Sequence, residues 1–244
     1  MIKVRKMNEQ NKFSKGIADG IPICLGYLSV AFAFGVFTGG NGLSVLEAVL
    51  ISMTNVTSAG QLAAVPIIVS GGSFIELAVA QLIINIRYSL MSVSLSQRLG
   101  KSVRLIDRFL IAFVNTDEVF AVASSQKNRV GKRYLYGLIL TPYIGWSLGT
   151  FLGAAAGNIL PEIVTSSLSV AIYAMFIAIV VPRVKEDGAT GKCVLAAIAL
   201  SCIFYYTPWL KTIPDGFVII ICAVLASVVM AVVSPVPVEV EEDE

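Results

Sequence analysis

The chain has 244 residues, of which 56% are hydrophobic and 14% charged, and its mean hydropathy is +0.82. Soluble domains are about 45–50% apolar and about 25% charged, so this composition predicts an all-α, polytopic transmembrane helical bundle. The net charge of +2 is small and the basic residues stand in short clusters, so we expect no nucleic acid partner.

The chain contains no histidine, which excludes histidine-based metal sites and Ser-His or Cys-His catalysis. Its four cysteines, Cys24, Cys193, Cys202 and Cys222, lie in apolar runs without CxxC spacing. An intramembrane hydrolase built on Asp117 would need a second aspartate at membrane depth, and the sequence offers none. We therefore expect no enzyme, no catalytic residues, no metal site and no cofactor.

Eight segments approach the length of about 20 apolar residues that a transmembrane helix needs. They are residues 17–37, 45–69, 74–95, 109–125, 135–156, 164–181, 193–206 and 217–233. Polar residues interrupt the second and fourth segments, at 55–61 and 115–118. Irregular backbone at membrane depth is tolerated only where protein or a water-filled cavity covers it, so both interruptions indicate a transport site.

The basic clusters test the topology, because short loops rich in Lys and Arg stay cytoplasmic. There are four: Lys3/Arg5/Lys6/Lys12/Lys15, Arg98/Lys101/Arg104/Arg108, Lys127/Arg129/Lys132/Arg133 and Arg183/Lys185/Lys192. If all eight segments cross, the second cluster falls outside. If the two interrupted segments enter and return on one side, leaving six spans and two re-entrant hairpins, all four clusters are cytoplasmic. The sequence leaves both versions open.

Both versions give one domain organisation for a multi-pass protein of the cell membrane. Residues 1–16 form a basic cytoplasmic N-terminus, 17–234 a transmembrane transporter domain, and 235–244 an acidic cytoplasmic tail. The similarity of 35–40 (Gly-Val-Phe-Thr-Gly-Gly) to 149–154 (Gly-Thr-Phe-Leu-Gly-Ala) indicates either an internal repeat or small residues that let helices pack closely.

The first interruption has the composition of a broken helix. Asn55, Thr57 and Ser58 are helix N-cap residue types, and Gly60 permits backbone conformations that other residues resist, so a half-helix is expected to start near Ser58. Its free N–H groups would favour a carboxylate, while unwound carbonyls with the amides of Asn55 and Gln61 would favour an ammonium group. Alternatively, the hydroxyls bond back to the helix and the amides join neighbouring helices.

Three charged residues lie deep within the apolar segments: Arg87, Asp117 and Glu118. Arg87, two residues after Asn85, is too deep to reach either membrane surface easily, so we expect an anionic partner: Asp117, Glu118 or the carboxylate of a substrate. Asp117 and Glu118 are the candidates for ion coupling or gating, together with Arg87. The alternative for Arg87 is a permanent structural ion pair.

At these residues the chain resembles the AzlC family of branched-chain amino acid exporters, the larger subunit of azaleucine-resistance permeases. The resemblance covers about residues 15–181 and rests on an ordered set of motifs. These are Gly20-Ile-Pro22, Gly26-Tyr27 and Phe34-Gly35, then Ser58-Ala-Gly-Gln61, Asn85-Ile-Arg-Tyr-Ser-Leu90 and Thr116-Asp-Glu-Val-Phe-Ala121.

The resemblance implies ion-gradient-driven export of Leu, Ile, Val or similar apolar amino acids, with a small membrane subunit of the AzlD type. Many relatives carry an acidic residue where this chain has Ser169. The sequence therefore predicts a secondary carrier for apolar amino acids. A carrier for another small solute and a non-transporting assembly subunit of the membrane are the alternatives.

Overall fold

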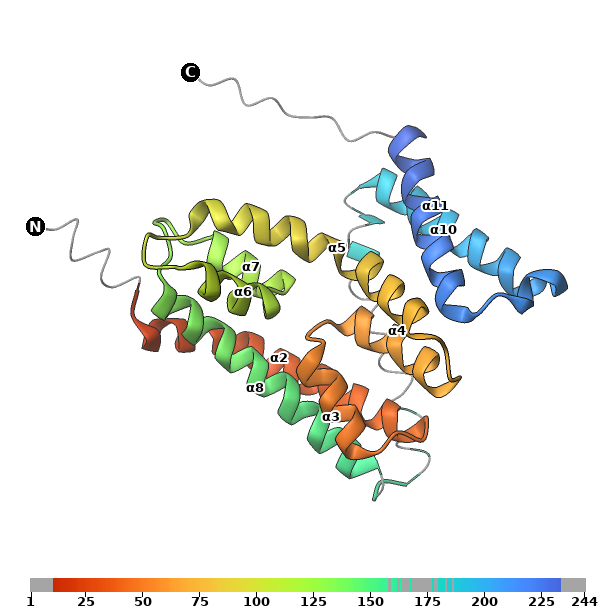
Figure 1. Ribbon diagram of the computed structural model, residues 1–244, viewed down its shortest axis with the longest axis horizontal. Coiled ribbons are helices and arrows are strands. Elements are labelled where there is room, and N and C mark those ends of the chain that lie inside the picture. Colours follow the sequence, from red (N-terminus) through yellow and green to blue (C-terminus); the bar gives the residue numbers. More distant parts are fainter. Residues whose placement is uncertain are drawn as a thin grey trace, which may run out of the picture. The chain divides into compact units, whose positions relative to one another are not determined.

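The computed structural model describes residues 11–157, 159–161, 163, 167, 177, 180–182, 184–185 and 187–233. Within these ranges the regular elements are helices, and the predicted all-α fold is confirmed. They are α2 (Phe13–Gly40), α3 (Val45–Thr54), α4 (Ser58–Val69), α5 (Phe74–Arg98), α6 (Leu105–Phe113), α7 (Asp117–Ser124), α8 (Lys132–Gly157), α10 (Gly188–Tyr206), the 3-10 helix η1 (Pro208–Thr212) and α11 (Asp215–Val233) (Figure 1).

Five of the described helices, α2, α5, α8, α10 and α11, are long and apolar enough to cross a membrane. They correspond to five of the eight predicted segments. The predicted segment 164–181 lies largely outside the described residues, as do residues 1–10 of the predicted basic N-terminus and the predicted acidic tail. The remaining two segments are the interrupted ones, and each is broken in the structure, into α3 and α4 and into α6 and α7.

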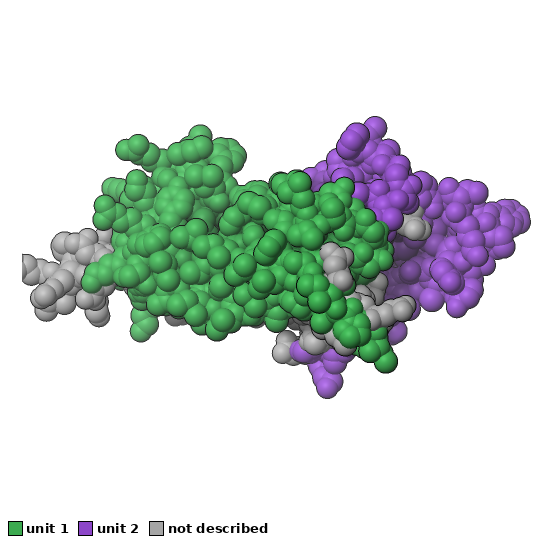
Figure 2. All heavy atoms as spheres, turned by 90° about the horizontal axis from the view of Figure 1, so that it is seen from below, with its two compact units in different colours: residues 1–65, 84–172 green, residues 66–83, 173–244 purple. Residues whose placement is uncertain are grey.

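The chain forms two compact units, which Figure 2 shows in different colours. Residues 66–83 and 173–244 form the second unit, where α10 packs against α11. Glu76 is buried there, and its Oε1 accepts a hydrogen bond of 2.9 Å from the backbone N–H of Gly216 at the start of α11. Asp187 caps the start of α10, and the hydrogen bonds from Thr190 and Ala189 lower the pKa of its carboxyl group.

The first unit, residues 1–65 and 84–172, is built on α2 and α8, which lie side by side in parallel (Figure 1). Glycines let the two backbones touch: a Cβ on Gly16 would lie 2.0 Å from the Tyr134 carbonyl oxygen, and one on Gly35 2.3 Å from that of Thr150. Gly149 and Gly153 approach α2 in the same way. In the two similar stretches Gly35, Gly149 and Gly153 therefore serve close helix packing, whereas a Cβ on Gly39 or Gly40 would meet nothing within 4 Å.

The part of α5 in this unit runs antiparallel to α2. Leu99, just past the end of α5, pairs with Val130, and the adjoining Gly131 lies against Asn11 at the start of α2. Twelve residues earlier Arg87 reaches Asp117, whose neighbour Glu118 is bound to Tyr27 in the middle of α2. The chain direction of α5 is therefore opposite to that of α2.

The α3–α4 segment turns back instead of crossing. It enters beside the C-terminal end of α2, and its carbonyl at Met53 accepts a 3.1 Å hydrogen bond from Tyr143, halfway along α8. After the break, α4 returns: Leu62 and Val65 pack with Phe34 near the C-terminal end of α2.

The α6–α7 segment turns back from the other side. Asp107 in the first turn of α6 accepts a 2.6 Å hydrogen bond from Tyr136 near the start of α8, and Phe113 at the end of α6 packs on Tyr143 with 6.4 Å between ring centroids. After the break, α7 runs back from Tyr27 towards Lys15 in the first turn of α2. Both interrupted segments are thus hairpins that turn back within the first unit, as the second of the two topologies requires of them.

This arrangement brings two basic clusters and the described part of a third, Lys12 and Lys15, together at one end of the first unit. Leu99 pairs with Val130, and the Ser102 hydroxyl accepts a 3.3 Å hydrogen bond from the N–H of Lys132. The N-terminal start of α2 lies there too, because Gly131 contacts Asn11. The opposite end is formed by residues around Gly40 and Gly157, and the sequence has no Lys or Arg from residue 16 to 86 or from 134 to 182. Because short loops rich in Lys and Arg stay cytoplasmic, we expect this basic end to face the cytoplasm.

A cysteine replacing Lys101, in a variant without the four native cysteines, tests this topology. We expect an impermeant thiol reagent to modify it from the cytoplasmic face only, because the 99–103 loop lies at the basic end. A cysteine replacing Asn41, an exposed residue at the other end of α2, is the matched control and should react only from outside. Modification of the Lys101→Cys variant from outside would show instead that the interrupted segments cross.

Candidate functional site

The α3–α4 break consists of Asn55, Val56 and Thr57. Asn55 ends α3, its N–H donating to the Ile51 carbonyl at 2.9 Å, and the Thr57 hydroxyl accepts a 2.9 Å hydrogen bond from the N–H of Gly60. Thr57 therefore caps a half-helix that starts at Ser58, as the sequence predicts. Gly60 is a buried helical residue without a positive φ, so the special backbone conformation expected there is not used.

Gln61 follows the alternative that the sequence left open, in which the amides join neighbouring helices. Its side chain is 1% exposed, and its Oε1 accepts a 3.0 Å hydrogen bond from Ser52, whose hydroxyl lies 2.7 Å from that of Thr150 on α8. Ser52 and Thr150 are fully buried. This Ser52–Gln61–Thr150 cluster ties both arms of the hairpin to α8, so the Gln61 amide binds helices together in this structure.

The α6–α7 break consists of Val114, Asn115 and Thr116. Thr116 caps α7, accepting from the Val119 N–H at 3.5 Å, which places Asp117 and Glu118 in the first turn of α7. Carboxylates are favoured there because the free N–H groups of a helix start carry positive partial charge. The break thus supplies two carboxylates at the tip of the hairpin.

Arg87 faces this tip. Its Nη2 lies 2.7 Å from Asp117 Oδ2 and donates a 2.9 Å hydrogen bond to the hydroxyl of Tyr88, over whose ring the guanidinium also stacks. Asp117, one of the three partners expected from the sequence, is therefore the partner in this structure. The side chains of Arg87 and Asp117 are 56% and 46% exposed, so a bound anion or cation has access to both charges. Asn85, two residues before Arg87 on α5, is half-buried.

Tyr27 holds the other carboxylate. Its hydroxyl is hydrogen-bonded to Glu118 and lies 2.6 Å from the Thr116 hydroxyl, while its ring packs edge-on against the buried Trp146. A phenol has one proton, and a carboxylate is the stronger acceptor, so Tyr27 donates to Glu118 and accepts from Thr116. Asp117 and Glu118 thus have separate partners on α5 and α2.

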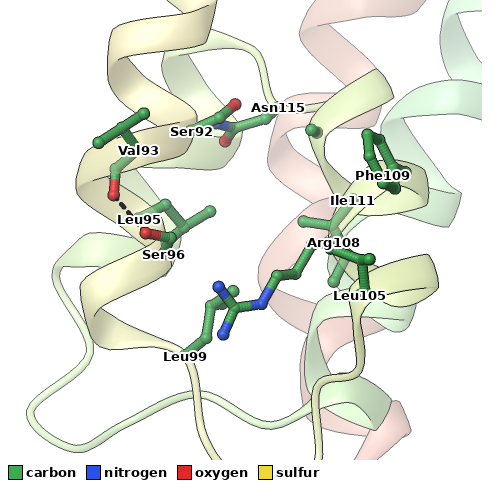
Figure 3. A pocket seen from close by; sticks show the side chains of 11 residues that line it. Ser92, Val93, Leu95, Ser96, Leu99, Leu105, Arg108, Phe109, Ile111 and Asn115 are labelled. Carbon is green, nitrogen blue, oxygen red and sulfur yellow. Dashed lines mark hydrogen bonds between the residues drawn. The ribbon is translucent and has the colours of Figure 1, made fainter.

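A hollow of about 270 Å³ lies between α5 and α6 (Figure 3). Its wall is mostly apolar, and Arg108 extends across it towards Leu99. Asn115 lies at its inner end, where its amide donates a 3.0 Å hydrogen bond to Ser92. Asn115 is 2% exposed, and its Oδ1 has no hydrogen-bond partner within the part of the chain that the structure describes.

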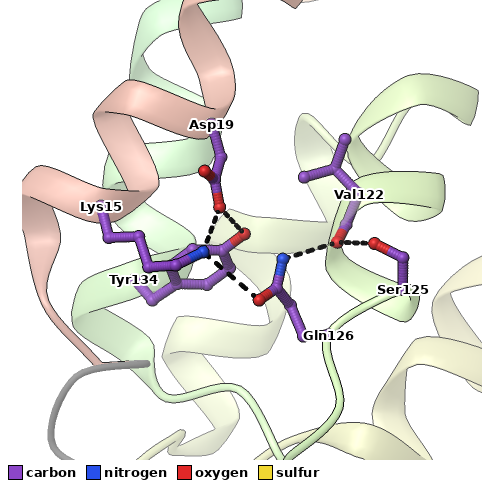
Figure 4. A network of polar contacts seen from close by, with 6 residues as sticks. All are labelled: Lys15, Asp19, Val122, Ser125, Gln126 and Tyr134. Carbon is purple, nitrogen blue, oxygen red and sulfur yellow. Dashed lines mark hydrogen bonds and ion pairs between the residues drawn. The ribbon is translucent and has the colours of Figure 1, made fainter.

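A separate network of hydrogen bonds joins the helices at the basic end (Figure 4). Asp19 accepts hydrogen bonds from Lys15 at 2.7 Å and from the buried Tyr134 at 2.8 Å, and Lys15 also lies 3.5 Å from the Gln126 amide oxygen. These contacts join α2, α8 and the segment after α7, so we interpret this network as structural.

The structure groups the predicted residues into two hairpin tips. Arg87, Asp117 and Glu118 are together, and Asn55, Thr57 and Ser58 belong to the other break. The two tips meet the same residue, Tyr143, through Met53 and Phe113. Sequence reasoning assigned no role to Tyr27, Asn115 or Tyr143. Tyr27 and Tyr143 could have been found from the sequence, because each places a hydroxyl at the middle of an apolar span.

Fold and site together define a multi-pass membrane protein of the transporter type. The chain belongs to the AzlC family: the model of the AzlC protein matches residues 22–160. It is 33% identical over 200 residues to an uncharacterized membrane protein of Archaeoglobus fulgidus, covering 81% of this chain and 88% of that protein. It is 29% identical over 193 residues to the inner membrane protein YgaZ of Escherichia coli K12, covering 76% and 78%. No solved structure matches the chain significantly.

Replacing Thr57 with Ala tests the cap at the first break. We expect the free energy of unfolding to fall by about 0.5–2 kcal/mol, because the Gly60 N–H loses its acceptor. Thr57→Ser keeps the acceptor and should restore most of the loss. Thr54→Ala is the matched control, since the Thr54 hydroxyl bonds only carbonyls of its own helix. Equal stability of the Thr54→Ala and Thr57→Ala proteins in detergent would contradict the cap.

Proposed function

We propose that this protein is a secondary carrier that exports branched-chain and other apolar amino acids across the cell membrane, driven by an ion gradient. The observation that carries the proposal is the meeting of two broken hairpins from opposite sides at Tyr143, next to an accessible Arg87–Asp117 pair. Membership of the AzlC family supports it.

The Arg87–Asp117 pair matches the two charges of a zwitterionic amino acid. A substrate carboxylate can replace Asp117 as the partner of Arg87, leaving the Asp117 carboxylate to accept the substrate's ammonium group. In this exchange Arg87 and Asp117 each keep one oppositely charged partner, so neither is left unpaired at membrane depth. Asn55, with Thr57, Ser58 and Gly60 at the start of α4, supplies amide and backbone groups from the other tip.

Apolar side chains at the tips provide the surface for an aliphatic group. Phe113 is 51% exposed beside Tyr143, whereas Val56 is buried and Leu62 packs against Phe34. Such surfaces discriminate by only about 1–3 kcal/mol per methylene, so one site should serve leucine, isoleucine and valine. We further propose that a small AzlD-type membrane subunit assembles with the chain, a proposal that rests on the family.

The direct test is leucine transport by the protein reconstituted with its small partner. We expect counterflow of labelled leucine above that of empty vesicles, competition by isoleucine and valine, and a loss of at least tenfold in Arg87→Gln and Asp117→Asn. Arg98→Gln, at the far end of α5, is the matched control and should retain transport. Leucine movement no faster than in empty vesicles would contradict the substrate. Normal transport by both site variants would contradict the site.

We assign ion coupling to Glu118, because its hydrogen-bond partner is Tyr27 and not Arg87. Glu118→Gln mimics the protonated carboxyl group permanently. We expect it to retain leucine counterflow, which needs no gradient, and to lose the acceleration that a proton gradient gives. Asp117→Asn should lose both. Gradient-driven transport by the Glu118→Gln protein equal to the unmodified protein would rule out Glu118 as the coupling residue.

A further inference from the structure

The two re-entrant hairpins share one design at a fixed spacing. α3 begins at Val45 and α6 at Leu105, 60 positions later. In the same register, Leu50 matches Leu110, Ile51 matches Ile111, and Asn55 matches Asn115. The breaks are residues 55–57 and 114–116, so the second break lies one position before the point that this register gives.

The helix starts are also capped alike. The Glu47 carboxylate accepts a 2.7 Å hydrogen bond from the Ser44 N–H, and Asp107, its counterpart 60 positions on, accepts one of 2.8 Å from the Arg104 N–H. After each break a threonine, Thr57 or Thr116, caps the second half-helix through the N–H three residues ahead. The correspondence therefore extends to the hydrogen bonds that fix the backbone.

The two hairpins are inverted relative to each other. Each follows a long helix, α2 or α5, and these helices run antiparallel. The hairpins enter from opposite ends of the first unit, and their tips meet at Tyr143 through Met53 and Phe113, again 60 positions apart. Entry from opposite ends with tips that meet is the arrangement expected of an inverted repeat, which secondary carriers use for alternating access.

The two hairpins differ in how tightly they pack against the neighbouring helices. At the α3–α4 hairpin, the Ser52–Gln61–Thr150 cluster is buried and Val36 of α2 is 1% exposed. At the α6–α7 hairpin the counterpart of Ser52 is Ala112, which makes no such bond, and a hollow of about 270 Å³ separates α6 from α5. Ser96, the counterpart of Val36, is half-buried and lines that hollow.

We propose that the α3–α4 and α6–α7 hairpins are equivalent gates that open alternately, and that this structure shows the gate at the basic end open and the other closed. The inference rests on the proposed transport function but not on the identity of the substrate. Asn115, with its buried amide oxygen at the inner end of the hollow, is the polar contact for a substrate on the basic side. Asn55 takes that role when the α3–α4 gate opens.

Breaking the Ser52–Gln61–Thr150 cluster should open the closed gate. Cysteines replacing Ser96 and Val36, each in a variant without the four native cysteines, report on the two entrances. Without substrate, we expect an impermeant thiol reagent to modify the Ser96→Cys protein from the basic side and to leave the Val36→Cys protein unmodified from either side. Adding Ser52→Ala with Thr150→Val should raise the rate of Val36→Cys modification from the opposite side at least fivefold and lower that of Ser96→Cys.

Thr141→Val is the matched control and should change neither rate, since Thr141 is a half-buried residue of α8 whose hydroxyl has no partner among the described residues. Gln61→Leu, a milder break of the cluster, serves where the double variant is not monodisperse in detergent. Unchanged rates in folded Ser52→Ala/Thr150→Val and Gln61→Leu proteins would overturn the alternating gates.

A separate arm tests the link to transport. Leucine should slow modification of the Ser96→Cys protein, and Asn115→Ala should abolish this protection. Absence of leucine protection together with the gate response would contradict the proposed substrate and leave the gates supported. Protection by leucine that survives Asn115→Ala would remove Asn115 as the contact.

Discussion

Backbone hydrogen bonding in hydrocarbon is the constraint on which the rest of the structure depends. Every N–H and C=O at membrane depth needs a partner, and an unpaired group there costs several kcal/mol. A chain that breaks its helices twice at that depth must therefore supply caps and neighbours. Thr57 and Thr116 supply the caps, and Tyr143 supplies the donor for the carbonyl of Met53.

The parallel contact of α2 and α8 provides the frame for those breaks. Glycines at Gly16, Gly35, Gly149 and Gly153 let the two backbones approach to within contact, so the pair forms a rigid wall. Against this wall both hairpin tips find fixed partners: Tyr27 and Tyr143 from its two helices. Close packing of small residues thus positions the polar groups of the site, although none of these four glycines belongs to it.

The carboxylates at the tip of the α6–α7 hairpin have two kinds of partner. Arg87 and Asp117 form a half-exposed pair, whereas Glu118 is hydrogen-bonded to the hydroxyl of Tyr27, which in turn lies 2.6 Å from the hydroxyl of Thr116. A pair that satisfies itself in the absence of substrate avoids an isolated charge at depth. The arrangement leaves one carboxyl group outside the pair, which is the physical reason for assigning substrate and ion to different carboxylates.

The sequence by itself determined the membrane class, the position of the apolar segments, both helix breaks and the start of a half-helix at Ser58, because apolar length and capping residues act locally. It also narrowed the partner of Arg87 to three anions. Only the tertiary structure decided that the broken segments turn back, that Asp117 is the partner, and that Gln61 is buried against Ser52. These depend on which face of a helix meets which neighbour, and the capping groups and apolar runs are the same whether a broken segment crosses or returns. The choice lies in long-range contacts such as Met53 with Tyr143 and Leu99 with Val130, which no local pattern encodes.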